Sequence, residues 1–232
     1  MNSIDSKERI KNHFETEAVE FDNLILKLIP FYEEMIEALI STIPFENNKD
    51  INVIDLGCGT GTISLKIKEK FPNAKITCLD IAENMLNIAK FKLSEFHEIT
   101  FCLGDFNDYT FDKKYDVVVS SLALHHLANN IDKKIFYEKV FKSLNDMGVF
   151  YNADVVLGSN SHNQNISMKK WTEYMNKNVS IEEIENKWIP NYEAEDRPAK
   201  LYDQLEWLSS IGFNNIDVVW KYHNFAVYGG QK

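Results

Sequence analysis

Val53-Ile54-Asp55-Leu56-Gly57-Cys58-Gly59-Thr60-Gly61 is the stretch that decides the fold of this chain of 232 residues. An apolar run typical of a buried strand leads into a loop with glycine at every second position. Glycine tolerates positive φ, and its missing Cβ lets a ligand lie against the backbone. The spacing G-x-G-x-G differs from G-x-G-x-x-G, the dinucleotide fingerprint. Taken alone, the loop is equally consistent with a tight strand-to-helix turn that binds nothing.

Outward from this loop, short apolar runs alternate with helical patterns. The strands we expect are 51–56, 75–80, 99–103, 115–120 and 148–155. The helical stripes between them include Leu86, Ala89, Leu93 and Phe96, and then Phe136, Val140 and Leu144. Residues 63–67 alternate like a strand, but their place after the glycine loop favours a helix. Such alternation predicts an α/β fold with a parallel, doubly wound sheet, which binds ligands at the carboxyl ends of its strands.

The flanks of this alternation predict helical cap segments. Residues 1–45 indicate two helices separated by Pro30, and residues 159–200 are polar, aromatic-rich and helical in parts. We interpret both as caps over the strand ends within a single domain, 1–232, whose cofactor-binding core is 46–158. Residues 201–232 then return to the core with a helix that stops at Gly212 and two strands, 216–220 and 225–228.

Two further strand ends carry polar side chains at the same edge of the expected sheet. Asp80 ends the second strand, where a carboxylate can accept hydrogen bonds from both hydroxyls of a ribose. Its other interpretation is a helix N-cap, because Ile81-Ala82-Glu83-Asn84 follows. Asp105 and Phe106 follow the third strand, where the carboxylate could accept an adenine amino group and the Phe106 backbone could bind a ring nitrogen. Their position in this series favours one nucleoside-containing ligand.

The motifs and their order resemble those of class I S-adenosylmethionine (SAM)-dependent methyltransferases. The resemblance rests on Asp55-Leu56-Gly57-Cys58-Gly59-Thr60-Gly61, Leu79-Asp80-Ile81 with Met85, Gly104-Asp105, Tyr115-Asp116-Val117-Val118-Val119-Ser120 and Leu144-Asn145-Asp146-Met147-Gly148. It implies a Rossmann-like, mostly parallel sheet of seven strands with the last one antiparallel, and methyl transfer that yields S-adenosylhomocysteine.

The resemblance also implies a role for each matching residue. The loop around Asp55, Gly57, Gly59 and Gly61 would accommodate the methionine part of SAM, and Asp80 would bind the ribose. The adenine would contact four residues, Ile81, Met85, Asp105 and Phe106. The methionine end would be lined by Ser120, Ser121 and Leu122.

Other segments resemble carboxy-SAM synthases, a branch of the same fold. They are Ile29-Pro30-Phe31-Tyr32, Leu124-His125-His126-Leu127 and Gly212-Phe213 with His223-Asn224-Phe225. By that resemblance Tyr32 would reach the cofactor. That family holds its extra carboxylate with an arginine near the C-terminal helix, whereas no arginine lies between Pro198 and Lys232 here, and its loop lacks the third glycine. We therefore expect ordinary methyl transfer.

His125 and His126 follow the fourth strand, where family members often meet their acceptor. Either histidine could deprotonate a hydroxyl or amine as the methyl group arrives, or both could simply cap a turn. Because transfer from a sulfonium is strongly driven, alignment could be the whole mechanism. A metal site assembled from His125, His126, Asp154 or His162 has no recognised ligand spacing, so we expect none.

Composition limits the acceptor and the location. The formal net charge of −10 and the presence of only two arginines, Arg9 and Arg197, make nucleic acid a poor substrate and favour a small molecule. The polar start and the lack of a long apolar run predict a cytoplasmic protein without a membrane span. The three cysteines show no C-x-x-C pair. The sequence leaves homodimer formation open. The alternative functions are a nicotinamide-dependent oxidoreductase and a non-catalytic SAM-binding protein.

Overall fold

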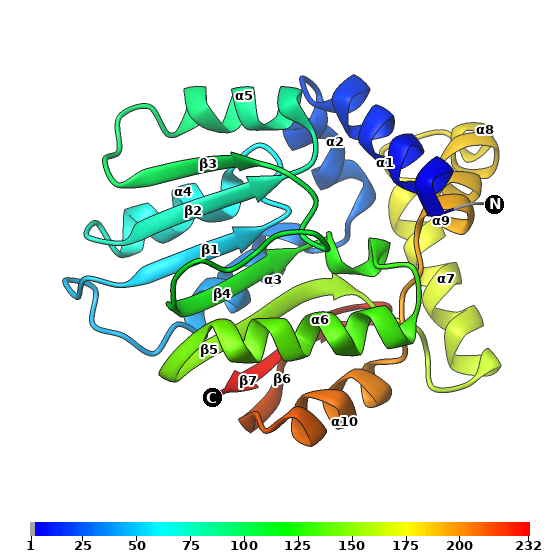
Figure 1. Ribbon diagram of the computed structural model, residues 1–232. Coiled ribbons are helices and arrows are strands. Elements are labelled where there is room, and N and C mark those ends of the chain that lie inside the picture. The colour runs from blue at the N-terminus through cyan, green and yellow to red at the C-terminus, as the bar shows by residue number, and fades with distance from the viewer. Residues whose placement is uncertain (1–2) are drawn as a thin grey trace.

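A mixed sheet of seven strands runs through the computed structural model, which describes residues 3–232 and the side chains of residues 8–232 (Figure 1). The strands are β1 (Asn52–Leu56), β2 (Lys75–Asp80), β3 (Ile99–Leu103), β4 (Tyr115–Ser121), β5 (Leu144–Val155), β6 (Asn214–Tyr222) and β7 (Phe225–Gln231). Their order in the sheet is β3-β2-β1-β4-β5-β7-β6, and β7 is antiparallel to both of its neighbours. The predicted strands and the antiparallel last strand are confirmed.

The order of the strands reverses between β1 and β4, which pair in parallel with Leu56 opposite Ser120. On its other side β1 pairs with β2, where Leu56 lies opposite Leu79. From β1 the chain proceeds to β2 and β3 on one side, and later from β4 to β5 on the other. This reversal leaves a crevice at the carboxyl ends of β1 and β4, the usual ligand site of doubly wound sheets.

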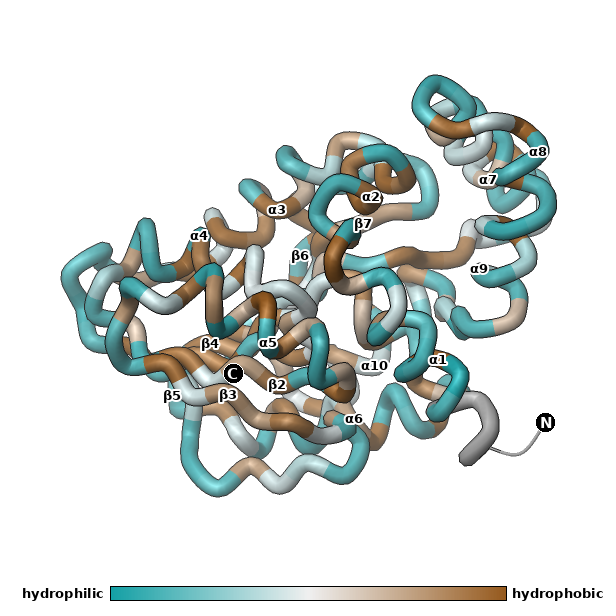
Figure 2. Tube along the Cα trace, turned by 90° about the horizontal axis from the view of Figure 1, so that it is seen from above, coloured by the Kyte–Doolittle hydropathy of each residue, from teal (hydrophilic) through white to brown (hydrophobic). Residues whose placement is uncertain are grey.

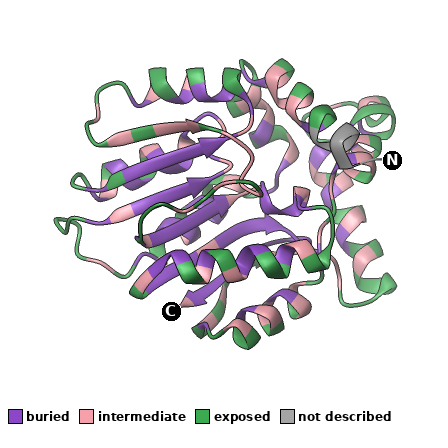
Figure 3. Cartoon of the chain, in the orientation of Figure 1, coloured by how far each residue is buried: buried purple, intermediate pink, exposed green. Residues whose placement is uncertain are grey.

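Helices cover both faces of the sheet. One face packs against α3 (Tyr32–Ser41), α4 (Thr62–Lys70) and α5 (Glu83–Lys92), and the other against α6 (Asn130–Ser143) and α10 (Leu201–Ile211). The central strands are buried on both sides, as Figure 3 shows, because each face is covered by a helical layer. Residues 63–67 lie in α4, so the helix favoured at the ambiguous segment is confirmed.

The remaining helices gather beyond the carboxyl ends of the strands, past the arrowheads in Figure 1. They are α1 (Ser3–Glu17), α2 (Phe21–Leu28), η1 (Leu124–His126, a 3-10 turn), α7 (Ser161–Met175), α8 (Ile181–Glu183), η2 (Ile184–Trp188, a π-helical turn) and α9 (Ile189–Glu195). In Figure 2 helices α7, α8 and α9 stand together to one side of the apolar strands, with α9 next to α1. These segments close off the crevice.

Three features differ from the sequence interpretation: a helix break, the position of one helix and one helix–strand boundary. The chain breaks at Pro30 as expected, but a second break at residues 18–20 divides the first helix into α1 and α2. Helix α3 packs on the sheet, with Met35 and Leu39 fully buried, instead of joining the cap. Leu144, expected on a helical stripe, begins β5 and pairs with Tyr115. Leu144 fits the apolar stripe of the preceding helix, and the polar Asn145 and Asp146 that follow it give no strand signal, so periodicity could not place the boundary.

Among the described residues, no helix is long and apolar enough to cross a membrane.

Candidate functional site

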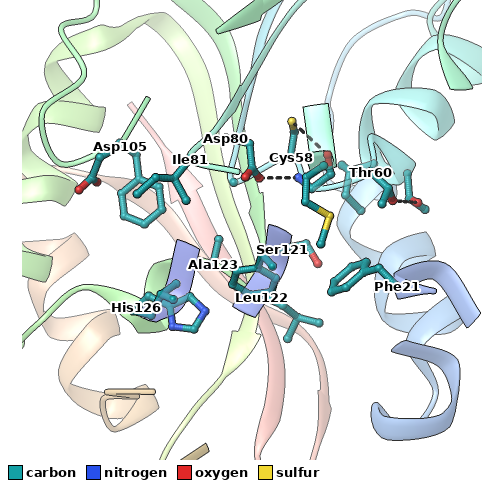
Figure 4. Close-up of a pocket in the computed structure, with 18 of the residues that line it drawn as sticks. Phe21, Cys58, Thr60, Asp80, Ile81, Asp105, Ser121, Leu122, Ala123 and His126 are labelled. Carbon is teal, nitrogen blue, oxygen red and sulfur yellow. Dashed lines mark hydrogen bonds between the residues drawn. The ribbon is translucent and has the colours of Figure 1, made fainter. Parts of the chain in front are cut away.

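A cavity lies at the carboxyl ends of β1, β2 and β4, between the sheet and helices α1 and α2 (Figure 4). The predicted site residues that line it are Tyr32, Gly57, Gly59, Asp80, Ile81, Met85, Asp105, Phe106, Ser121, Leu122 and His126. Figure 4 shows Asp80 and Ile81 on one side of the cavity and Phe21, Leu122 and His126 on the other. The structure thus brings together residues spread over almost a hundred positions of sequence.

The glycine loop is shaped by close approaches that side chains would prevent. Gly57 has φ +70°, and a Cβ on it would lie 2.4 Å from Cβ of Ala123. Gly59 has φ +53° and lines the cavity, where a Cβ on it would lie 4.0 Å from Cε1 of Phe21. Gly61 has φ +82° but packs on Ala89 of α5, outside the cavity lining. The first two glycines therefore form the cavity wall, whereas the third permits helix packing.

Asp80 ties the loop to the end of β2. Its Oδ2 accepts the Gly59 backbone N–H at 2.7 Å, and its Oδ1 accepts the Ala82 N–H at 2.9 Å. Burial raises the pKa of Asp80, although these backbone hydrogen bonds oppose the shift. The first N–H groups of α5, at Glu83 and Asn84, are instead accepted by the Glu15 carboxylate of α1. Asp80 therefore supports the loop, and the N-terminus of α5 is capped from another helix.

Four predicted residues lie outside the lining of this cavity: Gly61, Asp55, Ser120 and His125. Asp55 is fully buried beneath the loop, where its Oδ2 accepts a hydrogen bond from Ser64 at 2.7 Å. Burial raises the pKa of Asp55 to about 7, and the Asp80 charge adds to this shift. Ser120 donates to the Leu56 carbonyl at 2.8 Å. Asp55 and Ser120 therefore support the ends of β1 and β4 from behind the cavity.

Helix α2 is fastened to the glycine loop by contacts that the sequence analysis missed. The Thr60 hydroxyl donates to Asp22 Oδ1 at 2.5 Å, and Lys92 Nζ donates to Asp22 Oδ2 at 2.7 Å. Lys92 also bonds the hydroxyls of Thr60 and Thr62 at 3.0 and 2.9 Å. Helix α2, the glycine loop and α5, which carries Lys92, are distant in sequence, and no periodicity of the sequence relates them.

Helix α1 contributes a further part of the cavity that was missed. Ile10 and Phe14 of α1 and Phe21 of α2 line it. Ile10 and Phe14 are spaced i, i+4, which places them on one helix face and was the available signal.

A second cavity lies next to the first, under the cap. Its walls are mostly apolar and aromatic, and include Trp171, Trp188, Tyr192 and Phe225. The two cavities share four lining residues: Phe14, Phe21, Leu122 and His126. Trp171 both lines this cavity and donates to the Leu28 carbonyl at 2.7 Å, which fastens α7 to α2.

The two histidines of η1 have opposite electrostatic environments. His125 Nδ1 donates to Asp154 Oδ1 at 2.5 Å, and its Nε2 lies 3.5 Å from Asp196 Oδ1. Burial alone would lower the pKa of His125, but the charges of Asp154 and Asp196 raise it to about 10. Burial, with the adjacent charge of His125, lowers the pKa of His126 to about 4. His125 lines only the second cavity, whereas His126 lines both.

Lys133 of α6 holds this histidine turn in place. Its buried ammonium donates to the carbonyls of Leu124, His125 and Leu127 at 3.1, 3.3 and 2.7 Å. Burial lowers the pKa of Lys133 to about 8, although nearby carboxylates oppose the shift. The orientation of both imidazoles therefore depends on a residue that lies one helix away.

This arrangement matches a known family. A sequence profile described as a methyltransferase domain matches residues 47–207. The chain belongs to this family, and the resemblance to class I SAM-dependent methyltransferases is confirmed.

Curated relatives and solved structures support the family and the fold. A malonyl-[acyl-carrier protein] O-methyltransferase of Ilyobacter polytropus is 33% identical over 51% of this chain, and the match covers only 42% of that relative. A carboxy-SAM synthase of Nautilia profundicola is 26% identical over 90% of this chain and 88% of its own length. The structure of magnesium protoporphyrin IX methyltransferase from Synechocystis PCC 6803 superposes with a TM-score of 0.65 at 14% identity, covering 98% of this chain and 97% of that one.

Proposed function

We propose that this protein transfers the methyl group of SAM to a small molecule held in the second cavity. The observation that carries the proposal is the contact between the two cavities. They share Phe14, Phe21, Leu122 and His126, so a donor in the first and an acceptor in the second meet across these side chains.

The residues of the first cavity fit SAM. Gly57 and Gly59 leave the backbone bare where the methionine part would lie, and a Cβ at Gly57 would collide with Ala123. The Asp80 carboxylate lines the cavity and can accept ribose hydroxyls while it keeps its backbone contacts, because each carboxylate oxygen has two lone pairs. The apolar residues Ile81 and Met85 suit a planar adenine, and Asp105 and Phe106 lie at its expected edge. Tyr32, Ser121 and Leu122 close the methionine end.

Alignment supplies most of the catalysis in this proposal. SAM contributes a methyl group on a sulfonium, so that the S–C bond breaks as the acceptor's lone pair forms the new bond and the electron pair goes to sulfur. The cap helices exclude water from the reacting atoms. A hydroxyl or amine acceptor must also lose a proton.

His126 is the better placed of the two histidines to receive that proton. It lines both cavities, and its buried Nε2 has no hydrogen-bond partner among the described residues. His125, by contrast, is engaged at Nδ1 by Asp154 and lines only the second cavity. We therefore assign the base to His126, with the proton passing from the acceptor to Nε2.

A carboxy-SAM synthase-like reaction is the second candidate, favoured by the relative of similar length. By the resemblance given above, that reaction relies on an arginine to hold the extra carboxylate. Both arginines lie away from the first cavity: Arg9 pairs with Glu195, and Arg197 donates to carbonyls of its own segment. This arrangement supports methyl transfer over carboxy-SAM synthesis.

Two experiments test the proposal. Calorimetry with SAM, S-adenosylhomocysteine and NAD should give binding of the first two alone, and binding of NAD alone would contradict it. Incubation with methyl-labelled SAM and a panel of apolar hydroxyl and amine compounds should then label at least one acceptor. Binding without label transfer across the panel would favour a non-catalytic SAM-binding protein.

A cytoplasmic location and a homodimer stay predictions. Cell fractionation tests the location, and light scattering tests the oligomeric state.

A further inference from the structure

His125, His126 and Asp196 converge at the end of the second cavity that adjoins the first. One ligand atom from each of the three side chains lies within 4.8 Å of the other two. Asp196 Oδ1 is 3.5 Å from Nε2 of His125 and 3.5 Å from Nδ1 of His126. Donor atoms around a four-coordinate Zn²⁺ lie roughly 3.4 Å apart, given bonds of about 2.1 Å. Two of the three donor pairs are therefore close to the spacing that one ion requires, and the third pair lies within 4.8 Å.

The surroundings of the three side chains resemble the outer shell of a metal centre. The second ring nitrogen of His125 donates to Asp154 at 2.5 Å, and such a bond fixes the tautomer in which Nε2 is free to bind a metal. Asp154 is itself held by the Asn152 amide at 3.1 Å. The Arg197 backbone N–H donates to the His125 carbonyl at 2.9 Å, which anchors the segment that carries Asp196 beside η1.

The three side chains also lie where a bound ion could contact the acceptor. All three side chains line the second cavity, so a fourth ligand position would face the proposed acceptor. Two imidazoles and one carboxylate with an open position suit a divalent transition metal such as Zn²⁺ better than Mg²⁺ or Ca²⁺, which prefer oxygen ligands.

We infer that His125, His126 and Asp196 bind a divalent transition-metal ion, with Zn²⁺ as the representative, and that this ion receives an oxygen atom of the acceptor. The sequence analysis expected no metal because Asp196 lies 70 positions beyond His126 and has no fixed spacing to it. The inferred role rests on the proposed methyl transfer, but the binding itself does not. With an ion bound, His126 would act as a ligand, and the ion would replace it in promoting loss of the acceptor's proton.

The same contacts could instead form a metal-free ion-pair network, so the test must measure the ion itself. The untagged full chain, stripped with a chelator and dialysed, is titrated with ZnCl₂ in a calorimeter, and metal per chain is measured after gel filtration. We expect one Zn²⁺ per chain. Absence of binding by the wild-type protein would overturn the inference.

Substitutions locate the ion. Asp196→Asn keeps the size of the side chain but removes its charge, and His126→Ala removes a different ligand; each should weaken Zn²⁺ binding at least tenfold. Asp154→Asn should weaken it by roughly 10- to 100-fold through the orientation of His125. His162→Ala, an exposed histidine of α7, is the matched control and should bind as the wild type does. Unchanged affinity in both ligand variants would place the ion elsewhere and overturn the inference.

S-adenosylhomocysteine binding, measured on the same samples, separates the two proposals. Its loss in the wild-type protein would contradict the proposed function whatever the metal result, whereas its presence without Zn²⁺ binding would contradict only the metal site. Circular dichroism confirms that each variant is folded, and Co²⁺ serves as a second probe because its visible spectrum reports the coordination geometry.

Discussion

Asp80 has two roles in the structure, since it lines the first cavity and accepts the Gly59 and Ala82 N–H groups. Asp80→Asn retains its size and one acceptor oxygen but loses the charge that strengthens bonds to ribose hydroxyls. We expect about 10- to 100-fold weaker SAM binding, or roughly 1.5–3 kcal/mol, by calorimetry. Glu15→Gln, which alters the cap of α5 outside the cavity, is the control and should leave affinity unchanged. Unaltered affinity in Asp80→Asn would reduce this residue to support of the loop.

Asp55 predicts a pH dependence of stability. Its carboxyl is fully buried, and burial raises its pKa from 3.8 to about 7 in the folded protein. Between these values the unfolded chain has released the proton that the folded chain keeps, so this group destabilises the fold as pH rises from about 4 to 7. The resulting decrease in the free energy of unfolding is at most about 4 kcal/mol, at 1.36 kcal/mol per pKa unit.

Urea unfolding of wild type and Asp55→Asn from pH 4 to 8 measures this loss. The difference in unfolding free energy should shift in favour of the variant as pH rises. Asp112→Asn, which removes an exposed carboxylate, is the control for charge. A pH-independent difference between Asp55→Asn and wild type would mean that Asp55 is ionised throughout.

Lining residues of the first cavity could be predicted where each lies at the end of a recognisable strand, as Gly57 and Gly59 do after β1 and Asp80 does at the end of β2. Prediction failed where a contact joins distant segments. Asp196 meets His126 only because the cap folds back over η1, and Asp22 meets Thr60 only because α2 lies across the loop. Such pairs have no spacing that a single sequence could reveal.

At the scale of elements, α2 forms part of one wall of the first cavity, and Asp22 fastens it to Thr60 and Lys92. Asp22→Ala removes the acceptor of both bonds. We expect faster amide hydrogen exchange in α2 and in residues 57–62, and several-fold weaker SAM binding, because the wall is no longer held before the ligand arrives. Glu20→Ala, on the exposed turn before α2, is the control. Exchange unchanged in both segments would mean that apolar packing alone positions α2.

Strand and helix types were predictable because buried strands and amphipathic helices differ in period. The predicted ends of β2 and β3 match the structure: β2 begins and ends at charged residues, Lys75 and Asp80, and β3 lies between Glu98 and Gly104. The α6–β5 boundary at Leu144 was not predictable, because the helix gives way directly to the strand and Leu144 also continues the apolar stripe of the helix, while polar residues (Ser143 and Asn145) stand on both sides of it. The place of α3 on the sheet was missed for a related reason: its apolar face would suit a cap or a sheet equally well.

Across the whole molecule, the N-terminal segment and the 159–200 segment form one cover. Glu195 at the end of α9 accepts hydrogen bonds from Arg9 at 2.9 Å and from His13 at 2.7 Å, both on α1. Glu17 pairs with Lys187 of η2 at 2.9 Å. Between its two carboxylates, His13 has a pKa raised to about 9 by hydrogen bonds with Glu17 and Glu195. The two segments are therefore joined by charged contacts, and three of the side chains involved, His13, Glu17 and Glu195, also line the second cavity.

A joined cover should respond to the cofactor as a unit. When S-adenosylhomocysteine binds, hydrogen exchange should slow in α1, α2 and α9 together with the 57–61 loop, because the ligand contacts the first two and the charged contacts transmit the ordering to the third. Glu195→Gln weakens the contacts of α9 with Arg9 and His13 without a change in side-chain size. Ligand binding should then no longer slow hydrogen exchange in α9, whereas exchange in the 57–61 loop should still slow. Glu173→Gln, which alters an exposed pair within α7, should behave as wild type. If α9 gains protection equally in Glu195→Gln, or if only the loop responds in the wild-type protein, the two segments are independent packing elements and access to the second cavity is controlled elsewhere.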